Sequence, residues 1–241
     1  ASQSHTNLIG IPAFSKNLVI IGSGGDARET LEAVEAANQA GTADYKVLGF
    51  IVEARYGTPG ALVSGLPILG DFDWFAGRAG EVVAVGAVGS PVLRYRLVER
   101  AARYNIEFGN VIHPGAVISS SVRLGWGVIV EAGCVLTSQV RLGDHTHVNL
   151  ACSISHDTVL DDFATLSPGV HLAGRVRLGE GCFMGIGSVV IEGKQVGKWS
   201  VIGAGSVVIR DIPDRVTAVG VPTKIISSQP PANWITQSGE K

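Results

Sequence analysis

The chain has no large excess of charge of either sign and no long hydrophobic run. Its 19 Lys and Arg residues nearly balance its 21 Asp and Glu residues, which gives a net charge of −2. A near-neutral chain offers no electrostatic basis for binding nucleic acid or an anionic membrane. No apolar stretch approaches the ~18 residues that a membrane-spanning helix needs. These absences argue against nucleic-acid-binding and membrane-spanning proteins.

Cysteine is also scarce, with three residues in a chain of 241. Cys134, Cys152 and Cys182 all occupy the small-residue position of the repeat described below. Interior packing as reduced thiols is therefore favoured over a redox or metal-binding role. The first residues lack the basic lead-in of a secretory signal, so we expect a tail over 1–16 and a cytoplasmic protein.

The dominant feature that is present is an aliphatic residue or Met at every sixth position from Ile112 to Val208, seventeen times without a break. Four residues after each comes a second, mostly small residue, with Lys194 as the exception. A helix repeats every 3.6 residues and a strand every 2, so period 6 indicates a parallel β-helix of hexapeptides. Three hexads close one triangular coil, and at ~4.8 Å per coil the stack is roughly 25–30 Å tall.

Residues 17–107 show a different pattern, in which apolar strands alternate with helices. We expect strands at 17–21, 46–52, within 63–75 and at 81–88, and helices at 28–39, after Asp71 or Asp73, and at 90–105. This alternation predicts a small parallel sheet with helices on its faces, a Rossmann-like domain. The predicted organisation is a tail (1–16), this α/β domain (17–107), a β-helix (108–213) and a C-terminal cap and tail (214–241).

The turn GSGGDA at 22–27 lies between the first strand and the first helix. It matches G-x-G-x-x-A, whose glycines let a phosphate approach a helix N-terminus. The turn is compatible with an NAD(P) site that uses Glu53 as its acid, with a site for another nucleotide, and with a purely structural role. The domain spans about 90 residues, at most half a Rossmann sheet, which argues against a full dinucleotide.

His156 is the leading candidate for acid–base chemistry, because Asp157 follows it directly. A neighbouring carboxylate favours the imidazolium and can fix its tautomer, which suits a general base. A surface histidine at a solvated corner is an equally compatible interpretation. His145, His147 and His171 do not form a recognisable set of metal ligands, so no metal is expected. Glycine-rich segments at 181–190 and 200–208 leave backbone groups open to a long ligand, although coil geometry alone also favours glycine.

Taken together, these pieces resemble the bacterial sugar O- and N-acyltransferases of the left-handed β-helix class. That family includes sialic acid O-acetyltransferase-like proteins and acetyltransferases of UDP- or GDP-linked amino sugars. The resemblance covers 17–226 and rests on LVIIGSGGDARE, GLPILGDFDW, FGNVIHPGAVIS, SISHD with LSPG and LAG, and GVPTKII. It implies an acetyl-CoA-dependent acetyltransferase acting on the amino group of a nucleotide-activated amino sugar, for surface glycan synthesis. Sugar O-acetylation is the alternative.

The resemblance also implies roles for single residues. His156 would be the general base, oriented by Asp157, and the backbone N–H of Gly174 would hold the oxyanion. Acetyl-CoA would contact Gly174, Ile186, Gly203, Ala204 and Lys224. The nucleotide sugar would contact Gly22, Ser23, Gly24, Gly25, Asp26, Glu53 and Asn149. Members of the family are homotrimers with active sites between neighbouring subunits, and no metal is implied.

The chain differs from the usual family pattern in four places. Asp26 stands where relatives often have His, Glu53 where an acidic pair is common, and Gly86–Val88 where a polar segment is usual. All three lie where the nucleotide should bind. Thr165 stands where relatives often have His. These differences leave open a function of another class, a non-catalytic trimeric scaffold whose N-terminal domain senses a nucleotide.

Overall fold

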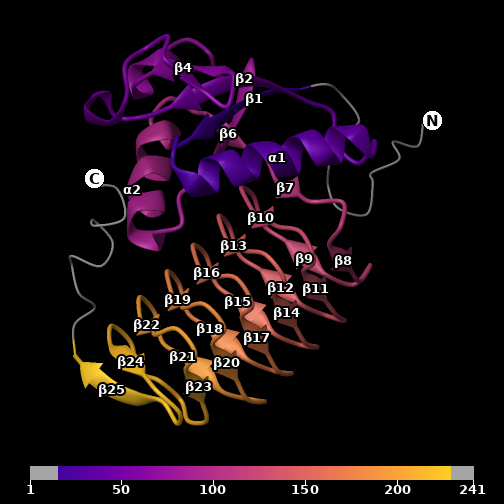
Figure 1. The fold of residues 1–241 in the computed structure, drawn as a ribbon, viewed down its shortest axis with the longest axis vertical. Helices are drawn as coiled ribbons and strands as arrows, with labels where there is room; N and C mark the ends of the chain where they lie inside the picture. The colour runs from indigo at the N-terminus through magenta and orange to yellow at the C-terminus, as the bar shows by residue number, and fades with distance from the viewer. Residues whose placement is uncertain (1–15, 229–241) are drawn as a thin grey trace.

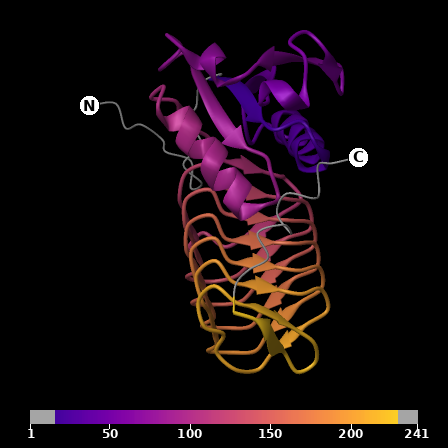
Figure 2. The same ribbon diagram turned by 90° about the vertical axis from the view of Figure 1, so that its left-hand side faces the viewer.

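The computed structural model describes residues 16–228, which form an α/β unit packed against a long β-helix (Figure 1). The tail expected at 1–16 lies outside the described residues except for Lys16. The tail expected at the C-terminus lies outside them from residue 229 onward. Seen from the side, the coils form a regular stack with the α/β unit at its N-terminal end (Figure 2).

The α/β unit is a six-stranded sheet in the order β3–β4–β2–β1–β5–β6. Its strands are β1 (Lys16–Ile21), β2 (Tyr45–Ile51), β3 (Leu62–Val63), β4 (Leu66–Gly70), β5 (Val82–Gly86) and β6 (Glu107–Phe108). All neighbours pair in parallel except β3 and β4, which pair antiparallel. The small, mainly parallel sheet expected from the sequence is therefore confirmed.

The two helices, α1 (Gly25–Gln39) and α2 (Pro91–Ala102), cover opposite faces of this sheet. Leu18 and Ile20 of β1 belong to the buried cluster that contains the apolar residues of α1. The intervening Val19 and Ile21 belong to the cluster that contains those of α2. This division follows from the two-residue period of a strand. Within residues 16–228, no helix has the length and apolarity required to cross a bilayer.

The first residues of α1, α2 and the turn after β4 show how local sequence sets where a helix begins. α1 begins at Gly25, before the predicted residue 28, so the end of the glycine turn is already helical. α2 begins as predicted, with the Ser90 hydroxyl accepting a hydrogen bond from the N–H of Leu93 at 3.2 Å. After β4, the predicted helix start is only a 3-10 turn, η2 (Phe72–Phe75), capped by Asp71. A second 3-10 turn, η1 (Ala54–Tyr56), follows β2.

The β-helix consists of seventeen two-residue strands on three faces, followed by a hairpin of β24 (Thr217–Val219) and β25 (Lys224–Ser227). Face 1 comprises β7 (Val111–Ile112), β10 (Ile129–Val130), β13 (His147–Val148), β16 (Thr165–Leu166), β19 (Phe183–Met184) and β22 (Val201–Ile202). Face 2 comprises β8 (Val117–Ile118), β11 (Val135–Leu136), β14 (Ser153–Ile154), β17 (His171–Leu172), β20 (Val189–Val190) and β23 (Val207–Val208). Face 3 comprises β9 (Arg123–Leu124), β12 (Arg141–Leu142), β15 (Val159–Leu160), β18 (Arg177–Leu178) and β21 (Gln195–Val196).

The second residue of every one of these strands is a residue of the predicted six-residue series. Each strand pairs in parallel with the strand 18 residues later, as Val130 does with Val148. Almost all members of the series are fully buried, and Ile118 and Leu124 in the first coil are partly buried. The predicted left-handed β-helix with three hexads per coil is therefore confirmed.

The outward residues differ strongly between the three faces. On face 1, Val111 and Ile129 share a buried cluster with residues of α1, so the α/β unit covers this face. On face 3 the outward row is largely Arg and is exposed. On face 2 the outward row is mostly Val, and Val117 is 65 % exposed. Face 2 is therefore the apolar face that nothing within residues 16–228 covers.

The close packing of the β-helix interior lets us predict how much stability is lost when one interior side chain is truncated. Leu166 is 0 % exposed and lies between Val148 and Met184 of the adjacent coils. Leu166→Ala should lower the free energy of unfolding by about 2–5 kcal/mol, because a closed coil relaxes poorly around a cavity. Chemical denaturation measures this loss. Leu62→Ala, at a side chain 69 % exposed, is the control and should stay within about 0.5 kcal/mol of wild type. Equal effects of the two variants would contradict a close-packed interior.

Candidate active site

His156 and Asp157 lie at the corner that follows β14, between faces 2 and 3. The His156 Nδ1 and Asp157 Oδ2 atoms are 2.9 Å apart, and the two side chains are 45 % and 55 % exposed. Asp157 has φ 60°, a left-handed conformation that its short polar side chain tolerates. A carboxylate bound at Nδ1 leaves Nε2 free to accept a proton. The corner therefore presents an open imidazole with one nitrogen already oriented.

Gly174 lies one coil beyond His156 and packs directly against its ring. A Cβ atom built on Gly174 would lie 2.5 Å from both Cε1 and Nε2 of His156. The backbone N–H of Arg175 donates to the His156 carbonyl at 2.8 Å, which holds the two coils in register. The N–H of Gly174 donates to no acceptor among residues 16–228. The structure thus brings together the predicted base and the predicted oxyanion donor.

The residues predicted to line the acetyl-CoA track gather at a different corner, between faces 1 and 2. Ile186 follows β19 and is 62 % exposed, and its carbonyl accepts from the Gly205 N–H at 2.8 Å. Gly203 and Ala204 follow β22 in the next coil. A Cβ on Gly203 would lie 2.6 Å from Val219, the residue that pairs with Lys224. Within one chain, face 2 separates this set from His156.

The predicted nucleotide-binding turn lies at the end of β1, where α1 begins. Gly24 is the N-cap of α1 and contributes no side-chain hydrogen bond. A Cβ on either Gly24 or Gly25 would meet nothing within 4 Å, so the start of the helix is open. Gly22 has φ +114°, and a Cβ there would lie 2.9 Å from the carbonyl oxygen of Ala87. Ser23 completes the turn, which is suited to an anion because the first N–H groups of a helix lack partners.

Glu53, the predicted acid at the end of the second strand, is occupied by two arginines. Its carboxylate lies 2.8 Å from Arg100 and 3.0 Å from Arg55. Arg100 also contacts Asp71 at 2.8 Å, and together with Phe72 and Ala54 N–H groups it offsets burial to lower the pKa of Asp71. Any contact between Glu53 and a nucleotide would have to share the carboxylate with these guanidinium groups.

Asn149 lies at the corner between faces 1 and 2 and is 6 % exposed. Its amide nitrogen donates to the Leu166 carbonyl at 2.9 Å, so this group supports the coil. One coil above it, Glu131 is also buried, and its Oε1 has no partner among residues 16–228. Burial, followed by the charges of Glu29, Asp26 and Glu32 on α1, raises the pKa of Glu131 to about 7. The sequence contained no signal that would have singled out Glu131.

The other histidines of residues 16–228 and the cysteines are buried or bonded. His145 stacks on Phe163 with ring centroids 4.9 Å apart, and burial lowers its pKa to about 4. Burial lowers the pKa of His147 to about 3. His171 lies 2.8 Å from the Ser153 hydroxyl. In the described part of the chain, no three His, Cys, Asp or Glu side chains are grouped to hold a metal. Cys134, Cys152 and Cys182 are buried free thiols, as predicted.

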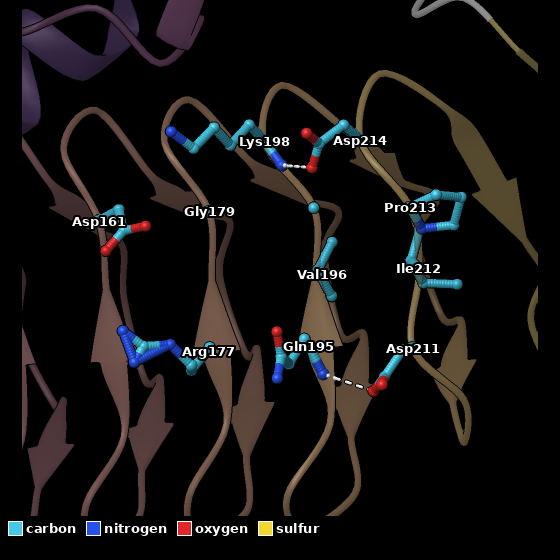
Figure 3. A pocket seen from close by; sticks show the side chains of 11 residues that line it. Asp161, Arg177, Gly179, Gln195, Val196, Lys198, Asp211, Ile212, Pro213 and Asp214 are labelled. Atoms are coloured by element: carbon cyan, nitrogen blue, oxygen red, sulfur yellow. Dashed lines mark hydrogen bonds between the residues drawn. The ribbon is translucent and has the colours of Figure 1, made fainter.

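A hollow of about 430 Å³ lies on face 3 near the C-terminal coils (Figure 3). Arg177 and Gln195 lie on its floor, and the last coil forms one wall. Two of its acids close the open end of the stack, since Asp211 accepts from the Gln195 N–H and Asp214 from the Lys198 N–H. The hollow contains none of the predicted site residues. It offers no histidine, and we assign it no chemistry.

Sequence reasoning missed one residue that joins the two units. Arg94 lies on the apolar side of α2, at the spacing of Leu97, Val98 and Ala101, and is 1 % exposed. It donates a hydrogen bond to the hydroxyl of Thr165 on face 1. A charged residue in the apolar register of a helix is the signal that could have identified it.

Comparisons with known proteins agree with this geometry. A family model described as the hexapeptide repeat of succinyl-transferase matches residues 115–138 and 175–210. A crystal structure of GDP-perosamine N-acetyltransferase from Caulobacter crescentus, in complex with CoA and GDP-perosamine, is 36% identical. That match covers 87% of this chain and 96% of that one, with a TM-score of 0.78. No curated protein sequence matches significantly.

Two further solved structures share the whole architecture. The acetyltransferase domain of PglB from Neisseria gonorrhoeae, in complex with acetyl coenzyme A, is 32% identical over 88% of this chain and 100% of that one, with a TM-score of 0.79. WeeI from Acinetobacter baumannii is 25% identical over 88% of this chain and 100% of that one, with a TM-score of 0.77. The chain therefore belongs to the hexapeptide-repeat family of bacterial sugar acetyltransferases, built on a left-handed β-helix.

Proposed function

We propose that the protein transfers an acetyl group from acetyl-CoA to the amino group of a nucleotide-activated amino sugar, in surface glycan synthesis. The observation that carries this proposal is the exposed His156–Asp157 pair with the Gly174 backbone packed against its ring. The relative that binds CoA and GDP-perosamine supports it. That relative was also solved with one histidine replaced by Asn or by Ala.

In the proposed mechanism the amine attacks the thioester carbonyl directly. Asp157 accepts the Nδ1–H of His156, so that Nε2 takes the proton from the attacking nitrogen. The N–H of Gly174 donates to the carbonyl oxygen as it gains negative charge. When the C–S bond breaks, the CoA thiolate leaves and receives the proton from the His156 imidazolium. No covalent enzyme intermediate is required.

The two substrates would approach from opposite ends of the site. We propose that the backbone at Ile186, Gly203 and Ala204 holds the pantetheine arm, with Lys224 near the CoA phosphates. The N–H groups at the start of α1, within the turn from Gly22 to Asp26, would bind the phosphates of the nucleotide sugar. Glu53 and Asn149 complete the proposed acceptor site, with the side-chain partners described above.

We propose a homotrimer with its active sites between subunits. Face 1 is covered by the α/β unit and face 3 carries charged arginines, so the valine-rich face 2 is the surface suited to burial against another copy. The His156 corner and the Ile186 corner lie on the two edges of face 2. Three-fold packing on this face would place the His156 corner of one copy opposite the Ile186 corner of the next.

A mixing experiment tests the shared site. His156→Ala removes the base, and Ala204→Trp fills the proposed pantetheine track, so each homotrimer should be inactive. Co-refolded at equal amounts, the two variants should regain activity at about a quarter of the sites, where both intact halves meet. Turnover is measured after mixing and compared with each variant alone. No recovery, despite mixed trimers seen by mass spectrometry, would contradict a site built from two subunits.

The function itself is tested by thiol release from acetyl-CoA. The purified protein is incubated with UDP-, dTDP- and GDP-linked amino sugars and with sialic acid. Release with an amino sugar supports the proposal, and release with sialic acid alone supports the O-acetyltransferase alternative. Measurable nucleotide binding without acetyl-CoA binding would favour the non-catalytic scaffold. A fluorescence titration with NADH tests the nicotinamide interpretation of the glycine turn.

A further inference from the structure

Arg94 on α2 is the largest fully buried side chain of the described residues. A buried guanidinium is costly unless its N–H groups are hydrogen-bonded, so the partners of Arg94 indicate what it does. Its planar fork can bind several oxygens in fixed directions, which a lysine ammonium cannot.

The partners of Arg94 lie on both structural units. On the β-helix, Nε donates to the His145 carbonyl at 3.0 Å, and Nη2 donates to the Phe163 carbonyl at 2.9 Å and to the Thr165 hydroxyl at 2.7 Å. On the α/β unit, Nη1 donates to the Val88 carbonyl at 2.6 Å. A single guanidinium therefore ties the loop after β5 to three successive coils.

That loop is packed without free space against the glycine turn. A Cβ on Gly22 would lie 2.9 Å from the Ala87 carbonyl oxygen. A Cβ on Gly89 would lie 3.1 Å from both carboxylate oxygens of Asp26, and one on Gly86 would lie 3.2 Å from Cγ of Arg94. If the guanidinium moved, the loop after β5 would therefore move with it and displace the glycine turn. Burial lowers the pKa of Arg94 to about 10, and the charge of Asp26 partly offsets that shift.

Two of the three coils that Arg94 binds contain the proposed catalytic corner. Phe163 ends the coil that contains His156, and Thr165 begins the coil that contains Gly174. We propose that Arg94 is a positioning residue that fixes where the nucleotide-sugar turn lies along the β-helix axis. The inference rests on the proposed function. In a three-fold assembly whose β-helix axes are parallel, the position of the turn along its own β-helix also fixes its position relative to the other copies.

Arg94→Lys tests this role against a merely structural one, with Arg96→Lys, an exposed position on the same helix, as the matched control. We expect Arg94→Lys to raise the KM for the nucleotide sugar roughly 10- to 100-fold, the scale of a small misplacement. The KM for acetyl-CoA should not change, because its proposed track lies on later coils. A loss of thermal stability alone, with both KM values unchanged, would overturn the proposal. If Arg94→Lys fails to fold, Thr165→Val removes one bond and should raise the same KM less.

Amide hydrogen exchange gives a readout that needs no activity. Residues 86–90 should exchange faster in Arg94→Lys than in wild type. Unchanged exchange would contradict the idea that Arg94 holds the loop after β5 in place. If the wild-type protein acetylates no acceptor, the proposed function is contradicted. The exchange result still tests whether Arg94 holds the loop in place.

Discussion

Replacing His156 with Ala should lower turnover by about 10²–10⁴-fold, the usual contribution of a positioned general base. The amine must lose a proton as it attacks, and His156 is the exposed base whose Nδ1 is held by Asp157 at 2.9 Å. The variant should remain folded, because the side chain is 45 % exposed and its carbonyl still accepts from the Arg175 N–H. Steady-state kinetics with acetyl-CoA and the accepted amino sugar measure the loss.

The matched control for this variant is His113→Ala in the first coil. His113 also lies at a half-exposed corner, and its Nδ1 accepts from the Gly115 N–H at 2.9 Å. Within residues 16–228 it has no carboxylate partner. We expect wild-type turnover for this control. Turnover of His156→Ala close to wild type, with an unchanged far-ultraviolet spectrum, would remove His156 from the role of base.

The second large effect is expected from a single methyl group. In Gly174→Ala the new Cβ would lie 2.5 Å from Cε1 and Nε2 of His156, closer than real Cβ contacts, so the ring must swing away. The swing should break the contact with Asp157 and lower turnover by about 10²-fold or more, the cost of a misplaced catalytic group. Gly174 does not have a left-handed φ, so its backbone accepts alanine. Activity should therefore fall while stability changes little.

Gly193→Ala controls for the effect of a methyl group at the same corner. Gly193 has φ +71°, and a Cβ there meets nothing within 4 Å. Arg175, one coil earlier at the same position, already adopts φ 58°. We expect a stability loss of about 1 kcal/mol from the left-handed backbone and unchanged turnover. Equal activity losses in the two glycine variants would show that the corner, rather than the His156 contact, responds to substitution.

The pairing of His156 with Gly174 could be predicted because it depends on local geometry. Once three hexads make a coil, residues 18 apart lie in adjacent coils, and 174 follows 156 by that spacing. The same 18-residue register explains why Ile186 and His156 are apart, because Ile186 follows a strand of face 1 and His156 a strand of face 2. The second copy that would bring them together is a proposal that rests on the family resemblance and on the exposed valines of face 2.

The surroundings of the nucleotide turn could not be predicted in this way. The sequence suggested Glu53 as an acid of the nucleotide site, and the fold places Arg100 and Arg55 against its carboxylate. The acid in the turn, Asp26, lies over Gly89 through the adjacency of β1 and β5. These contacts depend on which strands become neighbours, and residues as far apart as 53 and 100 carry no periodic signal.

The sequence by itself determined the β-helix, its coil length and the interior residues, because a six-residue period repeats one local conformation and each repeat buries the next. It also placed His156 and Gly174 in adjacent coils, at the corner that we propose to be catalytic. Only the tertiary structure decided how the α/β unit sits on the coils. That placement includes the hydrogen bonds of the buried Arg94 guanidinium, whose oxygen partners come from segments up to 71 residues away and meet only in the folded chain.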